Sequence, residues 1–257
     1  MNWKLSYFLF LCVLVSLSSC VQTRTLTTDN QKLDEFVRPD YIGTFASIYY
    51  VDVNQKVNIE PIQTLTSIYK NDSIIRKRVK KTNFTNQRFD TLTSRKINSA
   101  IFSILNYTKT NEKVKGFKAP DIFDEIGKTT TSNFNLYFIS TGFTKDTNLA
   151  KEEAILKGET IALNLLSGFA FGMSGVLIVN EAMKNGVNSK YTLDNTGLDF
   201  KGAFDGKQGL KGFLIVYDKN KKEICYIREQ FFSSSQSPLD LNSIRKQIKN
   251  AFKELYF

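Results

Sequence analysis

Hydrophobic residues recur at helical spacing in the middle of the chain. Between Thr93 and Asn106, apolar side chains stand at i, i+3, i+4, i+7 and i+8, namely Ile97, Ala100, Ile101, Ile104 and Leu105. Residues with this spacing share one face of an α-helix, and Thr93 or Ser94 can cap its start. The pattern predicts an amphipathic helix over Thr93–Asn106 with one face in the core.

Three later runs fit β-strands. After a short helix predicted from Asp121, Phe134–Phe143 is apolar on both alternating faces, which is typical of an interior strand. Phe213–Tyr217 and Ile224–Phe231 are separated by the polar turn Asp218–Lys222. Two strands joined in this way predict a β-hairpin.

The last predicted element is a closing helix. Pro238 is expected in its first turn, because proline is well tolerated there. Its apolar face is spaced by four, three and four residues, at Ile244, Ile248, Ala251 and Leu255. Its other face carries Arg245, Lys246, Lys249 and Lys253. We interpret these charges as helix stabilisation and solubility, since cations near the C-terminal end complement the helix dipole.

The apolar runs nearer the N-terminus are less decisive. Phe45–Val53 and Ile59–Tyr69 are too short and mixed to assign to helix or strand. Ser73–Lys81 sets a few apolar residues among cations, as a strand at a sheet edge would, because edge lysines discourage further pairing. The cations are Arg76, Lys77, Arg78, Lys80 and Lys81. They fit either a solvated charged face or a patch that binds anionic lipid or cell wall.

A glycine-rich apolar insertion is expected at about 148–212. Thr160–Asn180 contains no charged residue, and Gly168 and Gly172 have the small-xxx-small spacing that lets helices approach closely in lipid. We favour a helix over Asn148–Leu166 that packs on the sheet, followed by an apolar loop or short helix, because glycine within a helix is costly. Membrane insertion or self-association through Gly168 and Gly172 is the alternative.

The N-terminus has the order of an export signal. One positive charge, Lys4, precedes the uncharged apolar stretch Leu5–Val15, and small residues and a cysteine follow. The run Leu17-Ser18-Ser19-Cys20 resembles the lipobox of bacterial lipoproteins, in which the signal is removed and the cysteine is acylated. A membrane-spanning anchor needs roughly 20 apolar residues, more than this run provides. We therefore expect a signal peptide over residues 1–19 and lipidation of Cys20.

The expected mature chain is a tether followed by one domain. Residues 20–42 are polar and Thr-rich and include Arg38-Pro39-Asp40, which predicts a flexible tether. Residues 43–257 are long enough for a single domain. Cys12 leaves with the signal and Cys20 carries the lipid, so Cys225 remains as a free thiol. The mature chain therefore has no pair of cysteines for an intramolecular disulfide.

The charge of the chain favours anionic partners. The formal net charge is +10 at pH 7, and basic chains attract anions. An exported protein rarely meets nucleic acid, so lipid head groups, lipopolysaccharide or cell-wall polymer fit best. Val21 follows Cys20 with no aspartate beside it. By resemblance to lipoprotein sorting rules, this favours the outer membrane, facing the periplasm.

No catalytic or metal-binding constellation is visible in the sequence. The chain has no histidine, which excludes Ser-His and Cys-His nucleophile pairs. Cys225 alternates with apolar residues in its strand and is expected to be a small buried residue rather than a reactive thiol. Asp194, Asp199 and Asp205 stand in a glycine-punctuated polar loop that runs to Gly212, without the ligand spacing and closing glutamate of a calcium loop. We expect no cofactor, no metal and no enzymatic activity.

From Thr93 onward, the order of predicted elements resembles that of a group of α/β lipoproteins. These are the relatives of the curli-secretion lipoprotein, the penicillin-binding-protein activator lipoproteins and the N-terminal domain of TolB. Tyr137–Gly142, and Val216–Asp218 before its polar turn, carry the resemblance. Before Thr93, no clear first strand of the expected apolar type is visible. The resemblance implies a periplasmic scaffold that binds protein or cell wall or, in the secretion branch, an oligomeric pore.

These patterns predict an α+β domain with a mixed sheet, packed amphipathic helices and a C-terminal β-hairpin followed by a closing helix. The expected function is that of a membrane-anchored, non-enzymatic envelope lipoprotein that acts as a scaffold or adaptor for protein or cell-wall partners. An oligomeric secretion-channel or membrane-inserting component is the alternative. A histidine-free hydrolase is a third hypothesis, without supporting residues.

Overall fold

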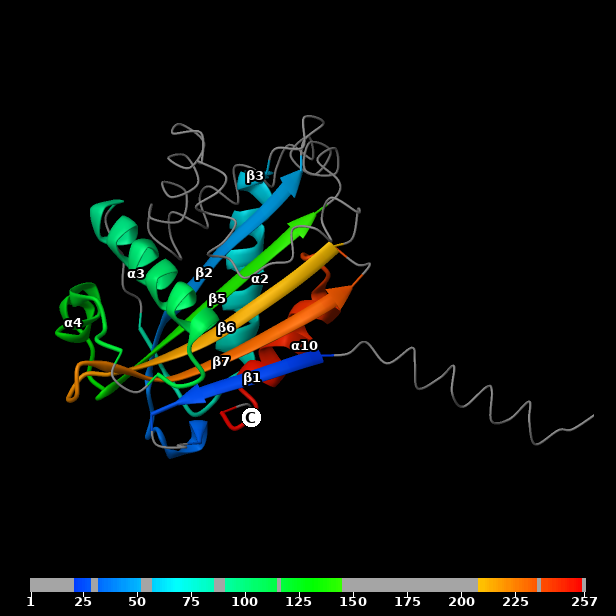
Figure 1. Ribbon diagram of the computed structural model, residues 1–257. Helices are drawn as coiled ribbons and strands as arrows, with labels where there is room; N and C mark the ends of the chain where they lie inside the picture. Colours follow the sequence, from blue (N-terminus) through cyan, green and yellow to red (C-terminus); the bar gives the residue numbers. More distant parts are fainter. Residues whose placement is uncertain are drawn as a thin grey trace, which may run out of the picture.

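A seven-stranded mixed sheet with helices on both faces forms the protein (Figure 1). The structure, a computed structural model, describes residues 21–28, 32–51, 57–85, 91–114, 117–144, 208–234 and 237–255. The strands are β1 (Val21–Thr27), β2 (Asp40–Val51), β3 (Val57–Ile59), β4 (Asn83–Phe84), β5 (Phe134–Thr144), β6 (Gln208–Asp218) and β7 (Glu223–Ser234). The helices are η1 (Leu33–Glu35), α2 (Pro61–Arg78), α3 (Thr91–Thr110), α4 (Asp121–Gly127) and α10 (Leu241–Ala251). The predicted α+β class is confirmed.

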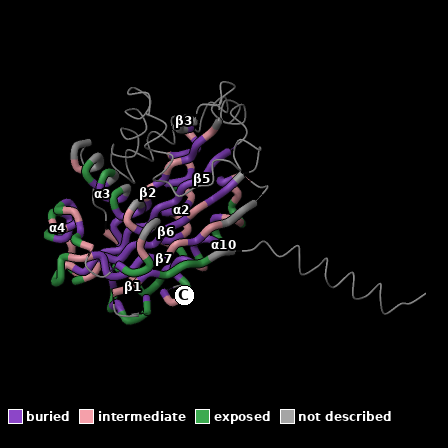
Figure 2. Tube along the Cα trace, in the orientation of Figure 1, coloured by how far each residue is buried: buried purple, intermediate pink, exposed green. Residues whose placement is uncertain are grey.

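The strand order is β1-β7-β6-β5-β2-β3, and β4 pairs with the start of β2. β2 runs parallel to β5, whereas β5, β6, β7 and β1 form a run of antiparallel neighbours. β5 is an interior strand that is buried on both faces, as its sequence predicts (Figure 2). β2 is the strand before Thr93 that the sequence pattern does not reveal.

The helices divide into two layers, because each amphipathic helix buries its apolar face on the sheet. α3 and α4 lie on one face and α2 and α10 on the other (Figure 1). The core under α3 and α4 includes Ile97, Ile101, Ile104, Phe123, Tyr137, Ile139 and Phe213. The core under α2 and α10 includes Ile75, Val79, Leu136, Phe138, Ile244, Ile248 and Phe252. The predicted amphipathic helix, the hairpin and the closing helix are thereby confirmed.

The expected tether over residues 20–42 is replaced, within the described residues, by ordered structure. Val21–Thr27 forms β1, which pairs antiparallel with β7 from Val21–Phe232 to Thr27–Tyr226. Leu26 is buried in the core under α3, and Leu33 and Phe36 are buried in the opposite core. A polar strand is stable here because it lies at the sheet edge, where its outer side chains face solvent.

The edge strand predicted for Ser73–Lys81 from its charges is also wrong. Most of this segment is the C-terminal part of α2, whose capping residue Val79 donates its N–H to the carbonyl of Ile75 at 2.8 Å. Ile75 and Val79 are fully buried, four residues apart on one helical face. A helix buries Ile75 and Val79 together and leaves Lys77 exposed, whereas the alternation of a strand would put Lys77 on the same face as the two buried residues.

Two further boundaries are corrected. α10 begins at Leu241, after Pro238, because Asp240 caps it: the Asp240 side chain accepts the N–H of Ser243 at 2.8 Å. β6 begins at Gln208, so Gln208–Gly212, which were expected in a polar loop, belong to a strand. Gly212 lies opposite Gln230 of β7 in the sheet.

Several predictions fall on residues outside the described ranges. These are the signal peptide over 1–19, the acylated Cys20, the helix over 148–166 and the pair Gly168 and Gly172. They stay predictions.

Candidate functional site

The exposed cations of α2, of α10 and of the segments that follow these two helices form what we call the basic surface. Its members are Lys77, Arg78, Lys80, Lys81, Arg245, Lys246, Lys249 and Lys253, all exposed. The first four belong to the predicted anionic-surface patch. Of the other four, Arg245, Lys246 and Lys249 lie on α10 and Lys253 follows its end; for these the sequence indicated only helix stabilisation and solubility.

Long-range hydrogen bonds hold the two helices side by side. The backbone N–H of Lys80 donates to the carbonyl of Leu255 at 3.2 Å. Farther along α2, the Lys70 ammonium donates to the carbonyl of Leu239 at 3.3 Å, just before α10. The two cationic segments, distant in sequence, therefore belong to one layer of the protein.

Carboxylates on this layer are withdrawn from the surface. Among residues 61–85 and 237–255, the acidic residues are Asp72, Asp240 and Glu254, and none of the three is exposed. Asp72 binds Arg76, Asp240 caps α10, and Glu254 binds Arg228. Because these acids are engaged, the outward charge of the two helices is positive, and anions are attracted to it.

Arg76 does not belong to the basic surface, although its sequence position suggested so. Its Nε donates to a carboxylate oxygen of Asp72 at 2.6 Å, and its guanidinium donates to the carbonyl of Thr85 at 3.2 Å. The guanidinium also stacks over the Phe84 ring, 5.4 Å from its centroid. Arg76 therefore joins α2 to β4. Burial raises the pKa of Asp72, an effect that the charge of Arg76 opposes.

The Arg228–Glu254 pair connects β7 to the end of α10. The guanidinium donates to both carboxylate oxygens, at 2.6 and 2.9 Å, and to the carbonyl of Ala251 at 3.2 Å. Burial alone would raise the pKa of Glu254, but the hydrogen bonds and charge of Arg228 outweigh it and lower that pKa. The pair fixes the geometry where α10 ends, between Lys249 of the helix and Lys253 just after it.

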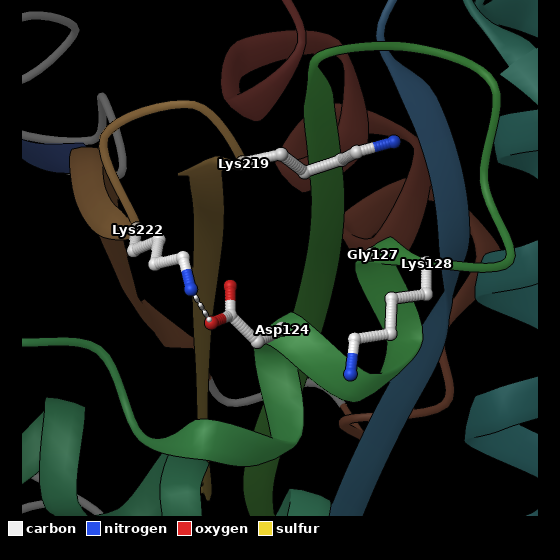
Figure 3. A pocket seen from close by; sticks show the side chains of 5 residues that line it. All are labelled: Asp124, Gly127, Lys128, Lys219 and Lys222. Carbon is white, nitrogen blue, oxygen red and sulfur yellow. Dashed lines mark ion pairs between the residues drawn. The ribbon is translucent and has the colours of Figure 1, made fainter.

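A second cationic feature is a pocket of about 260 Å³ between α4 and the β6–β7 turn, which we call the lysine pocket. It is lined by Asp124, Gly127, Lys128, Lys219 and Lys222. Figure 3 shows Lys222 pointing toward Asp124 and Lys219 extending from the turn toward the helix end. The Lys219 ammonium donates to the carbonyl and hydroxyl of Thr130, at 2.9 and 3.2 Å.

Asp124 is the single carboxylate of the lysine pocket, and its charge is already balanced. The Tyr217 hydroxyl donates to Asp124 Oδ1, and the Lys222 ammonium lies 3.0 Å from Oδ2. The hydrogen bond from Tyr217, together with Lys222 and Lys128, lowers the pKa of Asp124. The carboxylate is therefore ionised at neutral pH, and the pocket keeps an excess of positive charge.

Sequence reasoning did not find the lysine pocket. It placed Asp218–Lys222 in a polar turn and Asp124 in a short helix; both elements are confirmed, with Asp218 as the last residue of β6 rather than the first of the turn. The two elements meet only through the fold, because Tyr217 of β6 reaches Asp124 of α4. The lysines of the turn indicated a positively charged segment, but they did not indicate which helix would lie beside it.

Neither a metal cluster nor a membrane-spanning helix is found among the described residues. No group of three or more His, Cys, Asp or Glu side chains in the described ranges is arranged to hold a metal ion. No helix in those ranges combines the length and apolar character needed to cross a membrane.

Cys225 is buried beneath α10, and burial raises the pKa of its thiol. A buried neutral thiol is a packing residue rather than a nucleophile.

The chain was compared with protein families, curated proteins and solved structures. No family model matches the chain, and no curated protein matches it. Among solved structures, the PelC dodecamer from Paraburkholderia phytofirmans is 7% identical, with a TM-score of 0.36, over 92% of this chain and 97% of that one. A single-residue variant of that dodecamer is 8% identical, with a TM-score of 0.34, over 92% and 98% of the two chains.

The basic surface and the lysine pocket are both suited to binding anions. Lysine predominates in both cationic features, and it is a compact point charge that contacts phosphate or carboxylate without a fixed geometry. The basic surface is broad and suits an extended partner, whereas the lysine pocket suits a single anionic group.

Proposed function

We propose that the chain is a lipid-anchored, non-enzymatic lipoprotein of the bacterial cell envelope that acts as an adaptor. In this proposal Cys20 is acylated, the domain faces the periplasm from the outer membrane, and the basic surface binds an anionic partner. Cell-wall polymer and an acidic protein surface are the partner classes that fit this chemistry. The observation that carries the proposal is the cation-only exposed charge of α2 and α10.

The position of β1 supports the anchoring part of the proposal. β1 begins at Val21, directly after Cys20. A lipid on Cys20 would therefore be joined to the sheet without an intervening linker. The anchored domain would stay close to the membrane, and its partner would have to reach it there.

Lipidation is tested by feeding cells an alkyne-tagged fatty acid and comparing the intact chain with Cys20→Ala. We expect label and membrane association for the intact chain and neither for Cys20→Ala. Label that persists in Cys20→Ala would place the lipid elsewhere and contradict the proposal.

The role of the basic surface is tested with a variant in which four of its positive charges are removed, Lys77→Gln/Arg78→Gln/Lys80→Gln/Lys81→Gln. Its matched control removes the same charge from exposed lysines outside the basic surface, as Lys32→Gln/Lys96→Gln/Lys113→Gln/Lys118→Gln. Binding to isolated cell-wall sacculi and to envelope extracts is measured by co-sedimentation. We expect the basic-surface variant to lose at least tenfold in affinity and the control to retain it. Equal loss in both would mean that binding depends on net charge alone.

A second candidate function, a membrane-inserting or oligomeric secretion-channel component, is favoured by one feature of the topology. β5 ends at Thr144 and β6 begins at Gln208, at the end of the sheet where Val21 starts β1. The chain between them, with its uncharged run 160–180, therefore departs and returns on the anchored side. A sizing column on detergent-extracted protein tests this candidate. A large uniform oligomer would support it, and a Cys20→Ala monomer that stays soluble would exclude insertion.

A further inference from the structure

We propose that the lysine pocket binds a single carboxylate or phosphate group of an anionic ligand. Three lysines line the pocket against one carboxylate, and Asp124 already has Lys222 and the Tyr217 hydroxyl as partners. Lys128 and Lys219 therefore supply the excess charge. Each ammonium has three protons, and Lys219 directs its bonds at Thr130 alone, which leaves donor capacity for an incoming oxyanion.

The size of the lysine pocket fits an anionic group and little more. Its volume is about 260 Å³, below the range of about 300–1,000 Å³ that is usual for drug-sized ligands. A water molecule occupies about 30 Å³ in the liquid. A phosphate, or a carboxylate with part of a sugar or peptide, fits this space together with a few waters.

A buried amide lies directly behind the pocket. Asn135 is fully buried, and its side chain forms a hydrogen bond with the hydroxyl of Tyr137, the next residue on this face of β5. The two buried polar groups are therefore partners of one another, and the donors left for an oxyanion are the lysine ammonium groups that line the pocket.

Gly127 separates the lysine pocket from Asn135 and explains how close the two are. A Cβ on Gly127 would lie 3.8 Å from the Asn135 amide nitrogen and 3.2 Å from Cγ of Lys219. The absence of a side chain therefore lets the Lys219 stem lie over the helix end and leaves the amide near the pocket. An alanine there would push the Lys219 stem aside.

The pocket lies at the end of the sheet opposite to the proposed anchor, so this part of the inference rests on the proposed function. β1 starts at Val21 and reaches Thr27, which pairs with Tyr226 next to the β6–β7 turn (Figure 1). Seven residues at about 3.3 Å each span roughly 20 Å. This exceeds the Debye length of about 8 Å at physiological ionic strength. If the strands stand roughly perpendicular to the membrane, the pocket points away from it. The ligand would then come from the periplasm rather than from the head groups of the anchoring membrane.

The test is calorimetric titration of the full chain, purified in detergent, with inorganic phosphate and, separately, with N-acetylmuramic acid, a sugar carboxylate. Ionic strength is held constant with chloride. We expect saturable binding of at least one probe, and the stronger of the two identifies the phosphate or carboxylate source. The variant Lys128→Gln/Lys219→Gln should weaken binding tenfold or more, while Lys221→Gln, in the same turn but outside the pocket lining, should not.

Two further variants keep the result interpretable. Gly127→Ala should weaken binding without lowering the unfolding temperature, because alanine favours the helix. The basic-surface variant of the previous section should bind both probes normally. Absence of saturable binding, or equal loss with Lys221→Gln, would overturn the pocket while leaving the adaptor proposal standing. An unlabelled Cys20 would overturn the anchor while leaving the pocket standing.

Discussion

The backbone N–H of Lys80 donates a hydrogen bond to the carbonyl of Leu255, over a distance of 3.2 Å. Leu255 is buried in the core under α2 and α10, so this bond attaches the end of one cationic segment to the core beneath the other. Each segment by itself looks like an ordinary solvated helix end. Only their attachment makes the charges a single surface.

Leu26→Ala should destabilise the protein, because Leu26 is 1% exposed and packs in the core under α3. The expected loss is about 2–3 kcal/mol in the free energy of unfolding, the lower part of the range for buried leucine. Urea denaturation followed by circular dichroism measures it. Thr23→Ala, at an exposed position of β1, is the control and should change stability by less than about 0.5 kcal/mol. An unchanged urea midpoint for Leu26→Ala would restore the tether interpretation.

β1 shows why the sequence did not predict this edge of the sheet. Val21–Thr27 is polar, with Leu26 as its single buried large apolar side chain in the described part of the strand. Its stability depends on pairing with β7, whose residues lie near the other end of the chain. Local periodicity does not contain that information. β5 and the hairpin were predictable because their own residues are apolar on the buried faces.

α2 was hidden for a different reason. Part of its buried surface is polar: Gln63, Thr64, Ser67 and Asn71 are all buried. The Thr64 hydroxyl accepts the N–H of Ile48 at 2.9 Å, so a side chain of α2 satisfies a β2 backbone group. A helix that buries polar residues against a strand lacks the apolar stripe by which helices are recognised.

The stability of the protein should depend on pH through Glu254. Because its pKa in the folded protein is lowered by Arg228, the pair contributes stability above the unfolded pKa of about 4.3. That contribution is lost as pH falls through the folded value. The urea midpoint of the intact chain should therefore fall between about pH 5 and pH 3 more steeply than that of Glu254→Gln. At pH 7 Glu254→Gln should cost about 1–3 kcal/mol, as expected for a hydrogen bond between charged groups. Parallel pH profiles would contradict a role for the pair.

Cys225 should be unreactive in the native protein. Its side chain is 1% exposed, and its thiol lies 3.5 Å from the carbonyl of Val216, which accepts its weak hydrogen bond. Because the thiolate is the reactive form and burial raises the thiol pKa, iodoacetamide should label Cys225 only after unfolding. Mass spectrometry of Cys20→Ala protein, with its signal removed, gives a single-site readout. Rapid native labelling would show that α10 opens from the sheet.

The lysine pocket marks the limit of what the sequence could predict about a site. Its elements were predicted correctly, but the pocket depends on two tertiary relationships. Tyr217 reaches Asp124 across the two elements, and Gly127 permits Lys219 to lie over the helix end. A glycine near a helix end and a lysine in a turn are both common, and neither indicates the other.

Gly212 and Gln247 should be energetically coupled across the sheet and α10. A Cβ on Gly212 would lie 2.5 Å from Nε2, 2.7 Å from Cδ and 3.0 Å from Cγ of Gln247. The whole Gln247 side chain would have to move, and it is fully buried. Gly212→Ala should therefore cost about 1–3 kcal/mol by overpacking.

The double variant Gly212→Ala/Gln247→Ala distinguishes this clash from a general intolerance of alanine in β6. Gln247 has no hydrogen-bond partner for either amide atom within the described residues, so its truncation sacrifices packing but no hydrogen bond seen there. The added methyl would then occupy part of the space that Gln247 leaves. In a double-mutant cycle of urea midpoints, we expect a favourable coupling of about 1 kcal/mol or more, since contacting residues are not additive. Additive losses would mean that the Gly212 backbone itself, rather than Gln247, excludes a side chain.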